Sequence, residues 1–189
     1  KPPRPPWVPV YLSTSPELLN RERLEAQTGE GAGYRIEPPA AARAATIEAI
    51  ARRLAEARCP ALMFGDDVWR DGAAAEAVRL AETLEAPVFA SRQIFVNFPN
   101  RHALYCGTYP APKDFEKITG VTPDVLFMVG CQGVHGGVNE PSVIQIGPNP
   151  VLMGRHYPLD VAVQCGVRET LRALVEALAR RTGAAGWAR

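Results

Sequence analysis

Several features that would assign a chain quickly to a class of protein are missing from this sequence. Its 21 Lys and Arg residues nearly cancel its 20 Asp and Glu residues, and the basic residues are scattered. This balance gives no electrostatic case for binding nucleic acid or an anionic membrane. No apolar run approaches the ~20 residues that a transmembrane helix needs, and we find no signal-peptide pattern. We therefore expect neither a nucleic-acid nor a membrane protein.

Cysteines are few, and they form no metal-binding motif. Cys59, Cys106, Cys131 and Cys165 are widely spaced, with no CxxC pair. Structural zinc sites need closely spaced ligands, so a zinc site is not expected. An apolar fraction of 47% is sufficient for an ordinary core. We interpret the four cysteines as plain core or loop residues with free thiols, which indicates a cytoplasmic protein.

The first 37 residues are rich in proline and glycine. Residues 1–6, KPPRPP, are expected to be an extended arm because proline cannot donate a hydrogen bond to a sheet. Residues 8–13, VPVYLS, are interpreted as a short strand. The GxGxG at 29–33 follows no apolar strand, so residues 20–37 are interpreted as a linker rather than a nucleotide fingerprint. The chain begins with Lys1 instead of Met, as a fragment of a longer chain would.

From Pro38 onward, short apolar strands alternate with amphipathic helices. The expected strands cover 60–65, 86–91, 124–130, 142–147 and 160–165. We expect four helices. The first begins near Pro38, the second is capped by Asp71, the third covers 114–118, and the last includes Leu171 to Leu178. This alternation is typical of βα units on a parallel sheet. We predict one α/β domain over 38–183, doubly wound and Rossmann-like with helices on both faces, followed by a tail at 184–189.

Ligands of such sheets bind outside the carboxyl ends of the strands. The loops to search are therefore 65–71, 91–112, 130–141 and 147–151. The stretch 92–112 is expected to be a long loop rich in Asn, Pro and aromatic residues. A loop of that length in a compact domain is usually functional or at an interface.

The loop at 130–141 contains four glycines spaced GxxGxxGG. A dinucleotide fingerprint has GxGxxG after the first strand and opens into a helix, whereas Pro141 here leads into another strand. A nucleophilic pair of Cys131 and His135 is an alternative, but no orienting acid or oxyanion hole is evident. His135 is still well placed to face a ligand, and its pKa range suits proton transfer.

Two further segments each allow a functional and a structural interpretation. Asp66 and Asp67, within GDDVWRDG, could bind a ribose or a metal, or could provide turn and capping hydrogen bonds. The second segment is FPNRHALYCG (98–107). In the functional interpretation, an anionic group is bound by Arg101, His102, Tyr105 and Cys106. In the structural interpretation Phe98, Leu104 and Tyr105 attach the loop to the sheet edge, while Arg101 and His102 remain solvated. We favour the structural interpretation for both segments.

In order along the chain, these segments resemble the central domain of thiamine diphosphate-dependent enzymes such as acetolactate synthase and benzoylformate decarboxylase. The resemblance covers about residues 45–180 and rests on ARRLAEARCPALMFGDDV, AAEAVRLAETLEAPVFAS, FPNRHALYCGTY, PDVLFMVGC and VIQIGPNPVLMGRHYPLDVAVQCGVRETLRALVEAL. The series GDDV, LAETLEAPVFAS and FPNRH is closer to the benzoylformate decarboxylase branch. VPVYLSTSPELL resembles the last strand of the preceding pyrimidine-binding domain, so 1–37 would be the tail of that domain plus a linker.

The resemblance implies a 2-oxo acid decarboxylase or carboligase of which this chain is the middle. Such enzymes bind the cofactor diphosphate through Mg²⁺ with a Gly-Asp-Gly motif and a later Asn in a third domain. In this chain Arg70 precedes Asp71-Gly72, and no matching asparagine pair follows. We expect the chain alone to bind neither thiamine diphosphate nor Mg²⁺ and to be inactive. Its implied partners are the pyrimidine- and diphosphate-binding domains of the same enzyme, within a homo-oligomer that is a dimer or tetramer.

The resemblance also implies site residues. The family's central domain keeps a nucleotide-type cleft, which acetolactate synthases use for FAD and some relatives for ADP. We assign a residual cleft to Gly65, Asp66, Gly107 and Gly130. Acids that acetolactate synthases often carry at the fourth strand are replaced by the Gln-Ile-Gly-Pro-Asn-Pro of 145–150, so a functional FAD site is not expected.

Benzoylformate decarboxylase-like members carry a histidine for proton transfer in the loop after the third strand. His135 is the match, although it lies closer to Gly130 than in the family pattern. Two alternatives stay open. The first is a free-standing α/β module that binds FAD, ADP or NAD, and the second is a Cys/His hydrolase.

Overall fold

The computed structural model describes residues 40–91, 94–109, 117, 120, 122–132, 142–155 and 157–182. The chain divides into two units, 1–38 and 39–189, and all described residues belong to the second. The expected strand at 8–13, the linker at 20–37, the helix at 114–118 apart from Lys117, the tail and His135 lie outside these ranges. They stay predictions.

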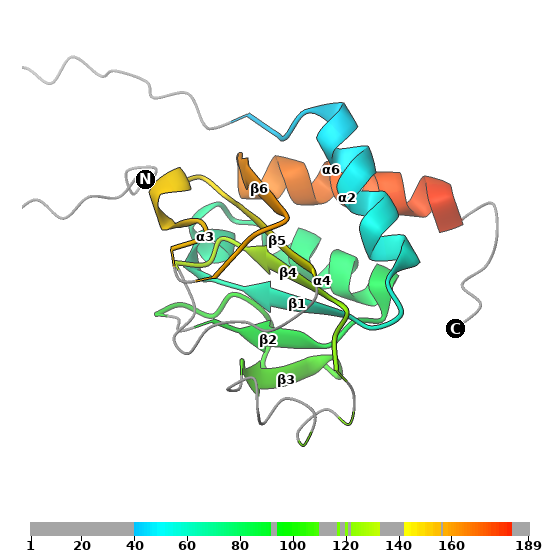
Figure 1. The fold of residues 1–189 in the computed structure, drawn as a ribbon. Helices are drawn as coiled ribbons and strands as arrows, with labels where there is room; N and C mark the ends of the chain where they lie inside the picture. Colours follow the sequence, from blue (N-terminus) through cyan, green and yellow to red (C-terminus); the bar gives the residue numbers. More distant parts are fainter. Residues whose placement is uncertain are drawn as a thin grey trace, which may run out of the picture. The chain divides into compact units, whose positions relative to one another are not determined.

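Six parallel strands form one sheet in the order β3-β2-β1-β4-β5-β6 (Figure 1). The strands are β1 (Pro60–Phe64), β2 (Val88–Ala90), β3 (Tyr105–Thr108), β4 (Val125–Val129), β5 (Ser142–Gly147) and β6 (Val161–Gln164). Every residue of β1 and β4 is buried, as expected for central parallel strands that are covered on both faces. The chain builds the sheet outward from β1 to β3 and then returns to β4, so the strand order reverses between β1 and β4. The predicted parallel α/β sheet is confirmed.

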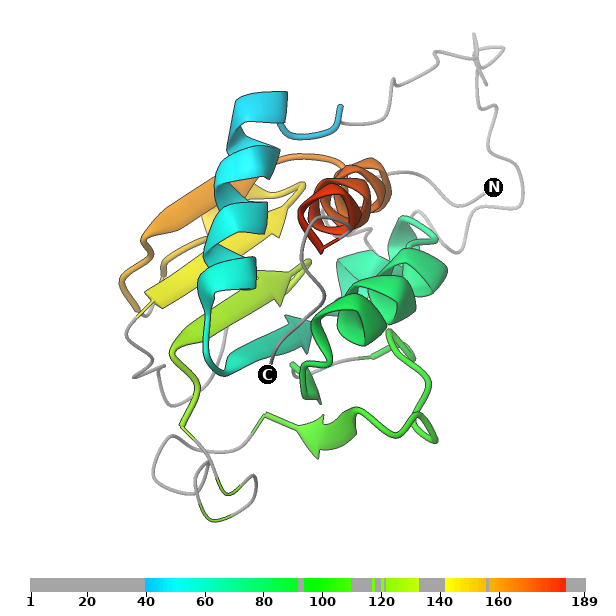
Figure 2. The same cartoon turned by 90° about the vertical axis from the view of Figure 1, so that its right-hand side faces the viewer.

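The three longer helices of the described region cover one face of the sheet (Figure 2). They are α2 (Ala44–Glu56), α4 (Ala74–Leu84) and α6 (Val167–Thr182), and two short elements, α3 (Asp66–Arg70) and the 3₁₀ turn η1 (Pro150–Leu152), lie in loops. Apolar residues three or four positions apart, such as Ile47, Ile50 and Leu54, form the buried stripe of α2. Helices on the opposite face, also expected, are not among the elements of the described ranges. None of the described helices combines the length and apolar character that crossing a membrane would require.

Alternate strand residues build two separate apolar clusters. Phe64 and Phe127 pack under the three helices, whereas Met63, Leu126 and Met128 point to the other face. Successive side chains of a strand point to opposite faces, so each central strand contributes to both clusters. Full burial of one such side chain stabilises the fold by about 1.5–3 kcal/mol. The central strands therefore form the most stable part of the sheet.

A buried carboxylate connects α4 to α6. The Oε1 atom of Glu76, whose side chain is 5% exposed, accepts hydrogen bonds from Arg168 Nε at 3.3 Å and Arg172 Nη2 at 3.4 Å. Burial opposes ionisation of this carboxyl group, but its own backbone N–H and the two arginines outweigh burial and lower the pKa of Glu76. Glu76 is therefore ionised at neutral pH and paired across the helix interface.

Asp71 does not cap α4, contrary to our expectation. Ala73 occupies the N-cap position of α4 and makes no side-chain capping bond. Asp71 Oδ2 instead accepts a 2.9 Å hydrogen bond from the backbone N–H of Arg168, in the first turn of α6. A carboxylate at a helix N-terminus is favourable because it accepts from a free N–H. Sequence spacing suggested the nearer helix, but folding brings the distant one to Asp71.

The stretch 92–112 is not a continuous loop, because it contains β3. This strand lies at the edge of the sheet, its residues alternate between half-buried and exposed, and its pairing with β2 has a register shift. Gly107 within it has a φ of +87°. An edge strand buries little and needs no apolar run, so the sequence pattern did not reveal it.

Candidate functional site

The carboxyl ends of β1, β4 and β5 form a row of glycines. Phe64 pairs with Val129, and Val129 with Ile146, so the next residues, Gly65, Gly130 and Gly147, come level with one another. We call these three residues the glycine row. The row lies at the position where the strand order reverses, which is where α/β sheets bind ligands.

Two members of the row pack too closely to allow a side chain. A Cβ atom at Gly65 would lie 2.6 Å from Cys131 Cα, and one at Gly130 would lie 2.8 Å from Asp67 Cβ. Gly130 also has a φ of +63°, which favours glycine. The Asp67 N–H donates to the Gly130 carbonyl at 3.3 Å. The predicted residues Gly65 and Gly130 are thus brought together, in direct backbone contact between the β1 and β4 loops.

Asp66 is buried beside the glycine row and binds the loop that follows β2. Its carboxylate, in a residue only 4% exposed, accepts hydrogen bonds from Ile94 N at 3.0 Å, Phe95 N at 3.1 Å and Asn97 Nδ2 at 3.2 Å. These bonds satisfy backbone donors that would otherwise be costly to bury. Asp66 therefore holds residues 94–97 against the start of α3.

Asp67 pairs with Arg70 within the same short helix. Asp67 Oδ1 lies 3.1 Å from Arg70 Nη1, and both side chains are largely buried. Burial raises the pKa of Asp67, against the opposing effect of Arg70. Within the described ranges no three His, Cys, Asp or Glu residues gather as a metal site. Both aspartates are used structurally, but not as the turn and capping residues that we expected: no side-chain cap is formed at α3, Asp66 binds a distant loop, and Asp67 pairs with Arg70.

Beyond Asp66, apolar side chains project from α3 and from the loop that follows β2. Trp69 stacks on Phe95 with ring centroids 4.1 Å apart and an interplanar angle of 8°. Ile94 is 80% exposed, Val96 60% and Trp69 48%. We call Trp69, Ile94, Phe95 and Val96 the edge patch. Sequence patterns did not single out these four residues, although a function or an interface was expected for the stretch 92–112.

Gly107 lies apart from the other predicted cleft residues. It belongs to β3, and β2 and β1 separate it from the β4 loop. A Cβ atom at Gly107 would meet nothing within 4 Å. The structure therefore brings together Gly65, Asp66 and Gly130, but not Gly107.

The segment around Phe98 anchors the sheet edge, as the structural interpretation holds. Phe98 is buried and stacks on Phe64 at 5.7 Å and on Tyr105 at 6.3 Å. His102 is not solvated as expected, because its side chain is only 21% exposed. Its Nε2 lies 3.3 Å from Glu82 Oε1, and its Nδ1 accepts from Leu104 N at 3.2 Å. His102 therefore helps to attach this segment to α4.

Cys131 lacks the properties of a nucleophile. The residue is 4% exposed, and burial raises the pKa of its thiol to about 12, so the thiolate is scarce at neutral pH. Its carbonyl accepts a 3.2 Å hydrogen bond from Gln145 Nε2, and Gln145 Oε1 accepts from the Tyr157 hydroxyl at 3.2 Å. Cys131 and Gln145 thus belong to a buried network on the second face of the sheet.

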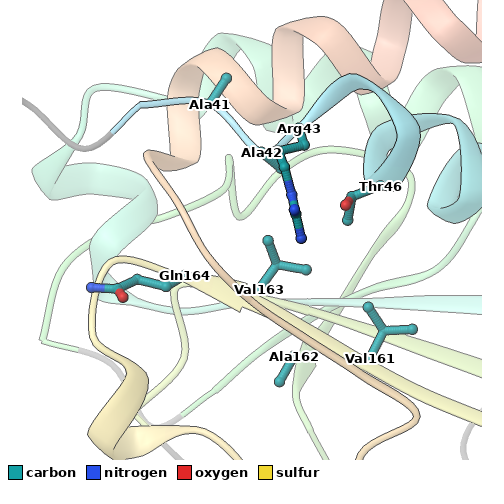
Figure 3. Close-up of a pocket in the computed structure, with 8 residues that line it drawn as sticks. All are labelled: Ala41, Ala42, Arg43, Thr46, Val161, Ala162, Val163 and Gln164. Carbon is teal, nitrogen blue, oxygen red and sulfur yellow. The ribbon is translucent and has the colours of Figure 1, made fainter.

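A groove of about 410 Å³ lies on the other side of the domain, between the start of α2 and the edge strand β6 (Figure 3). Arg43 and Thr46 contribute polar groups, and Val161 and Val163 form an apolar wall. Figure 3 shows the Arg43 side chain directed toward Val163. None of the predicted site residues lines this groove.

Similarity to known proteins assigns the domain to a family. A family model described as thiamine pyrophosphate enzyme, central domain, matches residues 47–174. The chain belongs to this family. The resemblance recognised in the sequence is thereby confirmed, and the described residues form most of the central domain.

Two curated relatives and one solved structure illustrate the similarity. The chain is 29% identical over 140 residues to the protein named probable acetolactate synthase large subunit of Methanocaldococcus jannaschii, covering 70% of this chain and 24% of the relative. It is 42% identical over 135 residues to the sulfoacetaldehyde acetyltransferase of Castellaniella defragrans, covering 65% and 22%. The structure of the thiamine diphosphate-dependent 4-hydroxybenzoylformate decarboxylase of Rhodococcus jostii RHA1 matches with a TM-score of 0.65 and 28% identity, covering 76% and 29%. The chain spans about a quarter of the length of both curated relatives.

Proposed function

We propose that this central domain is part of a longer thiamine diphosphate-dependent 2-oxo acid decarboxylase or carboligase and is not active as the 189-residue chain alone. The observation that carries the proposal is the match of 47–174 to a central domain, in relatives about four times longer than the matched part. The decisive assay adds pyruvate and benzoylformate to the full-length protein with and without thiamine diphosphate. Cofactor-dependent CO₂ release is expected, and its absence with every 2-oxo acid would contradict the proposal.

A second candidate is an acetyltransferase that uses the same cofactor. The 42% identity to sulfoacetaldehyde acetyltransferase exceeds the identity to the acetolactate synthase and to the Rhodococcus decarboxylase, and this favours it. Both candidates place the chain in the same family. Consumption of sulfoacetaldehyde by the full-length protein, without turnover of 2-oxo acids, would select the acetyltransferase.

The cofactor is proposed to be held by other domains of the parent enzyme. Thiamine diphosphate supplies a stabilised carbanion equivalent to the reaction. Within the described residues, the paired carboxylates nearest the glycine row do not fit Mg²⁺, because Asp66 already accepts from Ile94 N and Phe95 N and Asp67 is paired with Arg70. We assign the diphosphate and the metal to the pyrimidine- and diphosphate-binding domains, in a cytoplasmic homo-oligomer that is a dimer or tetramer. Light scattering of the full-length protein tests the oligomer.

His135 is proposed to take part in proton transfer in the parent enzyme. Its loop leaves β4 at the carboxyl edge of the sheet, directly after the glycine row, which supports a position facing a ligand. We expect His135→Ala in the full-length enzyme to lower kcat, with a change in the pH profile near neutrality. An unchanged turnover number across its substrates would remove the role.

We propose that Gly65, Asp66 and Gly130 mark a vestigial nucleotide cleft that binds no nucleotide tightly; Gly107, assigned to the same cleft from the sequence, lies apart in β3. Gly65 and Gly130 are used for backbone packing, and the Asp66 carboxylate is occupied by Ile94 and Phe95. Calorimetric titration of the 189-residue chain with FAD, ADP and NAD is expected to show no tight binding. Tight binding of any of the three would favour the free-standing nucleotide-binding module.

A further inference from the structure

The edge patch concentrates the exposed apolar surface of the domain. The described residues leave four large apolar side chains exposed, and three of them, Trp69, Ile94 and Val96, belong to this patch. The fourth is Val151 in η1. Single exposed apolar residues are ordinary, whereas a contiguous exposed group marks an interaction surface.

Hydrogen bonds and ring contacts hold the patch in place with its apolar side chains outward. Asp66 accepts from the backbone N–H groups of Ile94 and Phe95. On the other side the Phe95 ring stacks on Trp69, and the Arg70 guanidinium lies 5.6 Å from the Phe95 centroid. A buried carboxylate and a cation–π contact thus fix a loop that gains little burial of its own.

The charges beside the patch argue against a membrane or a nucleic acid as its partner. Among the described residues, Arg70 lies over the Phe95 ring, and its guanidinium is already paired with Asp67. Asp66 and Asp67 together outnumber it. Among the described residues, the cation that contacts the patch is thus already paired, and the exposed side chains of the patch are apolar, which suits an apolar protein surface.

We propose that the edge patch, positioned by Asp66, docks against another domain of the same enzyme. This inference rests on the proposed function, because it requires the longer parent protein. The chain covers only 29% of the Rhodococcus decarboxylase structure and about a quarter of both curated relatives, so most of the protein surface available to it would come from the parent. The patch follows β1 and β2 at the carboxyl edge, where α/β sheets meet their ligands and neighbours.

Thiol labelling measures directly whether the patch is covered. Val96→Cys is compared with the matched control Val151→Cys, since Val151 is 73% exposed and also at the carboxyl edge; Cys106 is replaced by Ser in both. We expect the Val96→Cys thiol to react with a maleimide at least about tenfold more slowly in the full-length protein than in the 189-residue chain, because a covered thiol reacts only when the contact opens. The control is expected to react at similar rates in both.

Equal rates for Val96→Cys in the two proteins would overturn the proposal, and so would equal slowing of the control. Slowing that appears in the 189-residue chain as its concentration rises would assign the patch to a second copy instead. The labelling needs no enzyme activity. A parent protein that proves inactive on every substrate but protects Val96→Cys would therefore contradict the proposed function and leave the docking surface standing.

A second variant tests the role of the loop without adding a thiol. Val96→Asp in the full-length protein is expected to make cleavage by limited proteolysis faster, because an undocked domain opens more often, whereas Val151→Asp is expected not to. Because Val96 is exposed in the 189-residue chain, thermal unfolding of that chain should be unchanged by either substitution. Identical proteolysis of both variants would contradict a docked patch.

Discussion

The glycine row and the edge patch lie beside each other at the same edge of the sheet, yet they are built in opposite ways. In the glycine row, the loops after β1 and β4 approach until no side chain fits between Gly65 and Cys131. In the edge patch, the loop after β2 is held by Asp66 while Ile94 and Val96 point into solvent. Tight packing at one place and exposure at the next indicate that the first stabilises the domain and the second is available to a partner.

The largest loss of stability is expected from a substitution that disrupts the glycine row. Gly65→Ala places a Cβ atom 2.6 Å from Cys131 Cα, where backbone must move, and should lower the free energy of unfolding by about 3 kcal/mol. Gly147→Ala is the matched control, because its Cβ atom would lie 3.6 Å from the nearest atom, Gly130 Cα. That control should change the stability by less than about 1 kcal/mol. Urea unfolding of the 189-residue chain gives both values, and equal losses would show that the close approach is unimportant.

The next largest loss of stability is expected when the edge patch loses the Asp66 carboxylate that holds it. Asp66→Ala removes the acceptor for Ile94 N, Phe95 N and Asn97 Nδ2, and should cost about 2 kcal/mol because buried polar groups lose a partner. Amide hydrogen exchange of Ile94 and Phe95 should accelerate more than that of Val129 in β4. If those two amides kept their protection, Asp66 would not be what holds the loop.

A smaller free-energy change is expected for the stacking of the Trp69 and Phe95 rings inside the edge patch. Trp69→Leu and Phe95→Leu, made singly and together, should show a coupling free energy of about 1 kcal/mol, as expected for stacked rings at 4.1 Å. Urea unfolding of the three variants supplies the double-mutant cycle. Additive losses would mean that the two rings are stabilised independently.

The smallest change in stability is expected at Val96, where a substitution tests whether the edge patch contributes to folding of the domain. Val96→Ser in the 189-residue chain should change the free energy of unfolding by less than about 0.5 kcal/mol, because the side chain is already 60% exposed. Val88→Ser, at a fully buried valine of β2, serves as the reference and should be far more destabilising. A large loss at Val96 would assign the patch to the core instead of to a docking surface.

Elements with strong local patterns could be predicted from the sequence. The apolar runs of β1, β4 and β5 were recognised because central parallel strands are buried on both faces, and α2 was recognised from its helical period. The edge strand β3 was missed because its alternating residues and Gly107 resemble a loop. Asp71 was assigned to the wrong helix, and His102 was expected in solvent, because Arg168 and Glu82 approach them only after folding.

The candidate site shows the same limit. Gly65, Asp66 and Gly130 were identified as strand-end residues, but their roles depend on which loops meet. The Asp66 carboxylate accepts a hydrogen bond from the backbone N–H of Ile94, which lies 28 positions further along the chain. The local periodicity of the sequence does not predict such a contact. Trp69 and Ile94 were not singled out because exposed apolar residues in a single short helical turn or in a loop have no distinctive spacing.

The amino-acid sequence by itself determined the alternation of strands and helices, the parallel α/β class and the family. It could do so because strand and helix periods are local properties of the backbone, and because the ordered series of segments is specific to these enzymes. Only the tertiary structure decided the neighbours: β1 beside β4, Gly65 against Cys131, and Asp66 beneath Ile94. The first two contacts follow from the reversal of strand order, which places β4 beside β1, whereas the third joins the loops after the neighbouring strands β1 and β2.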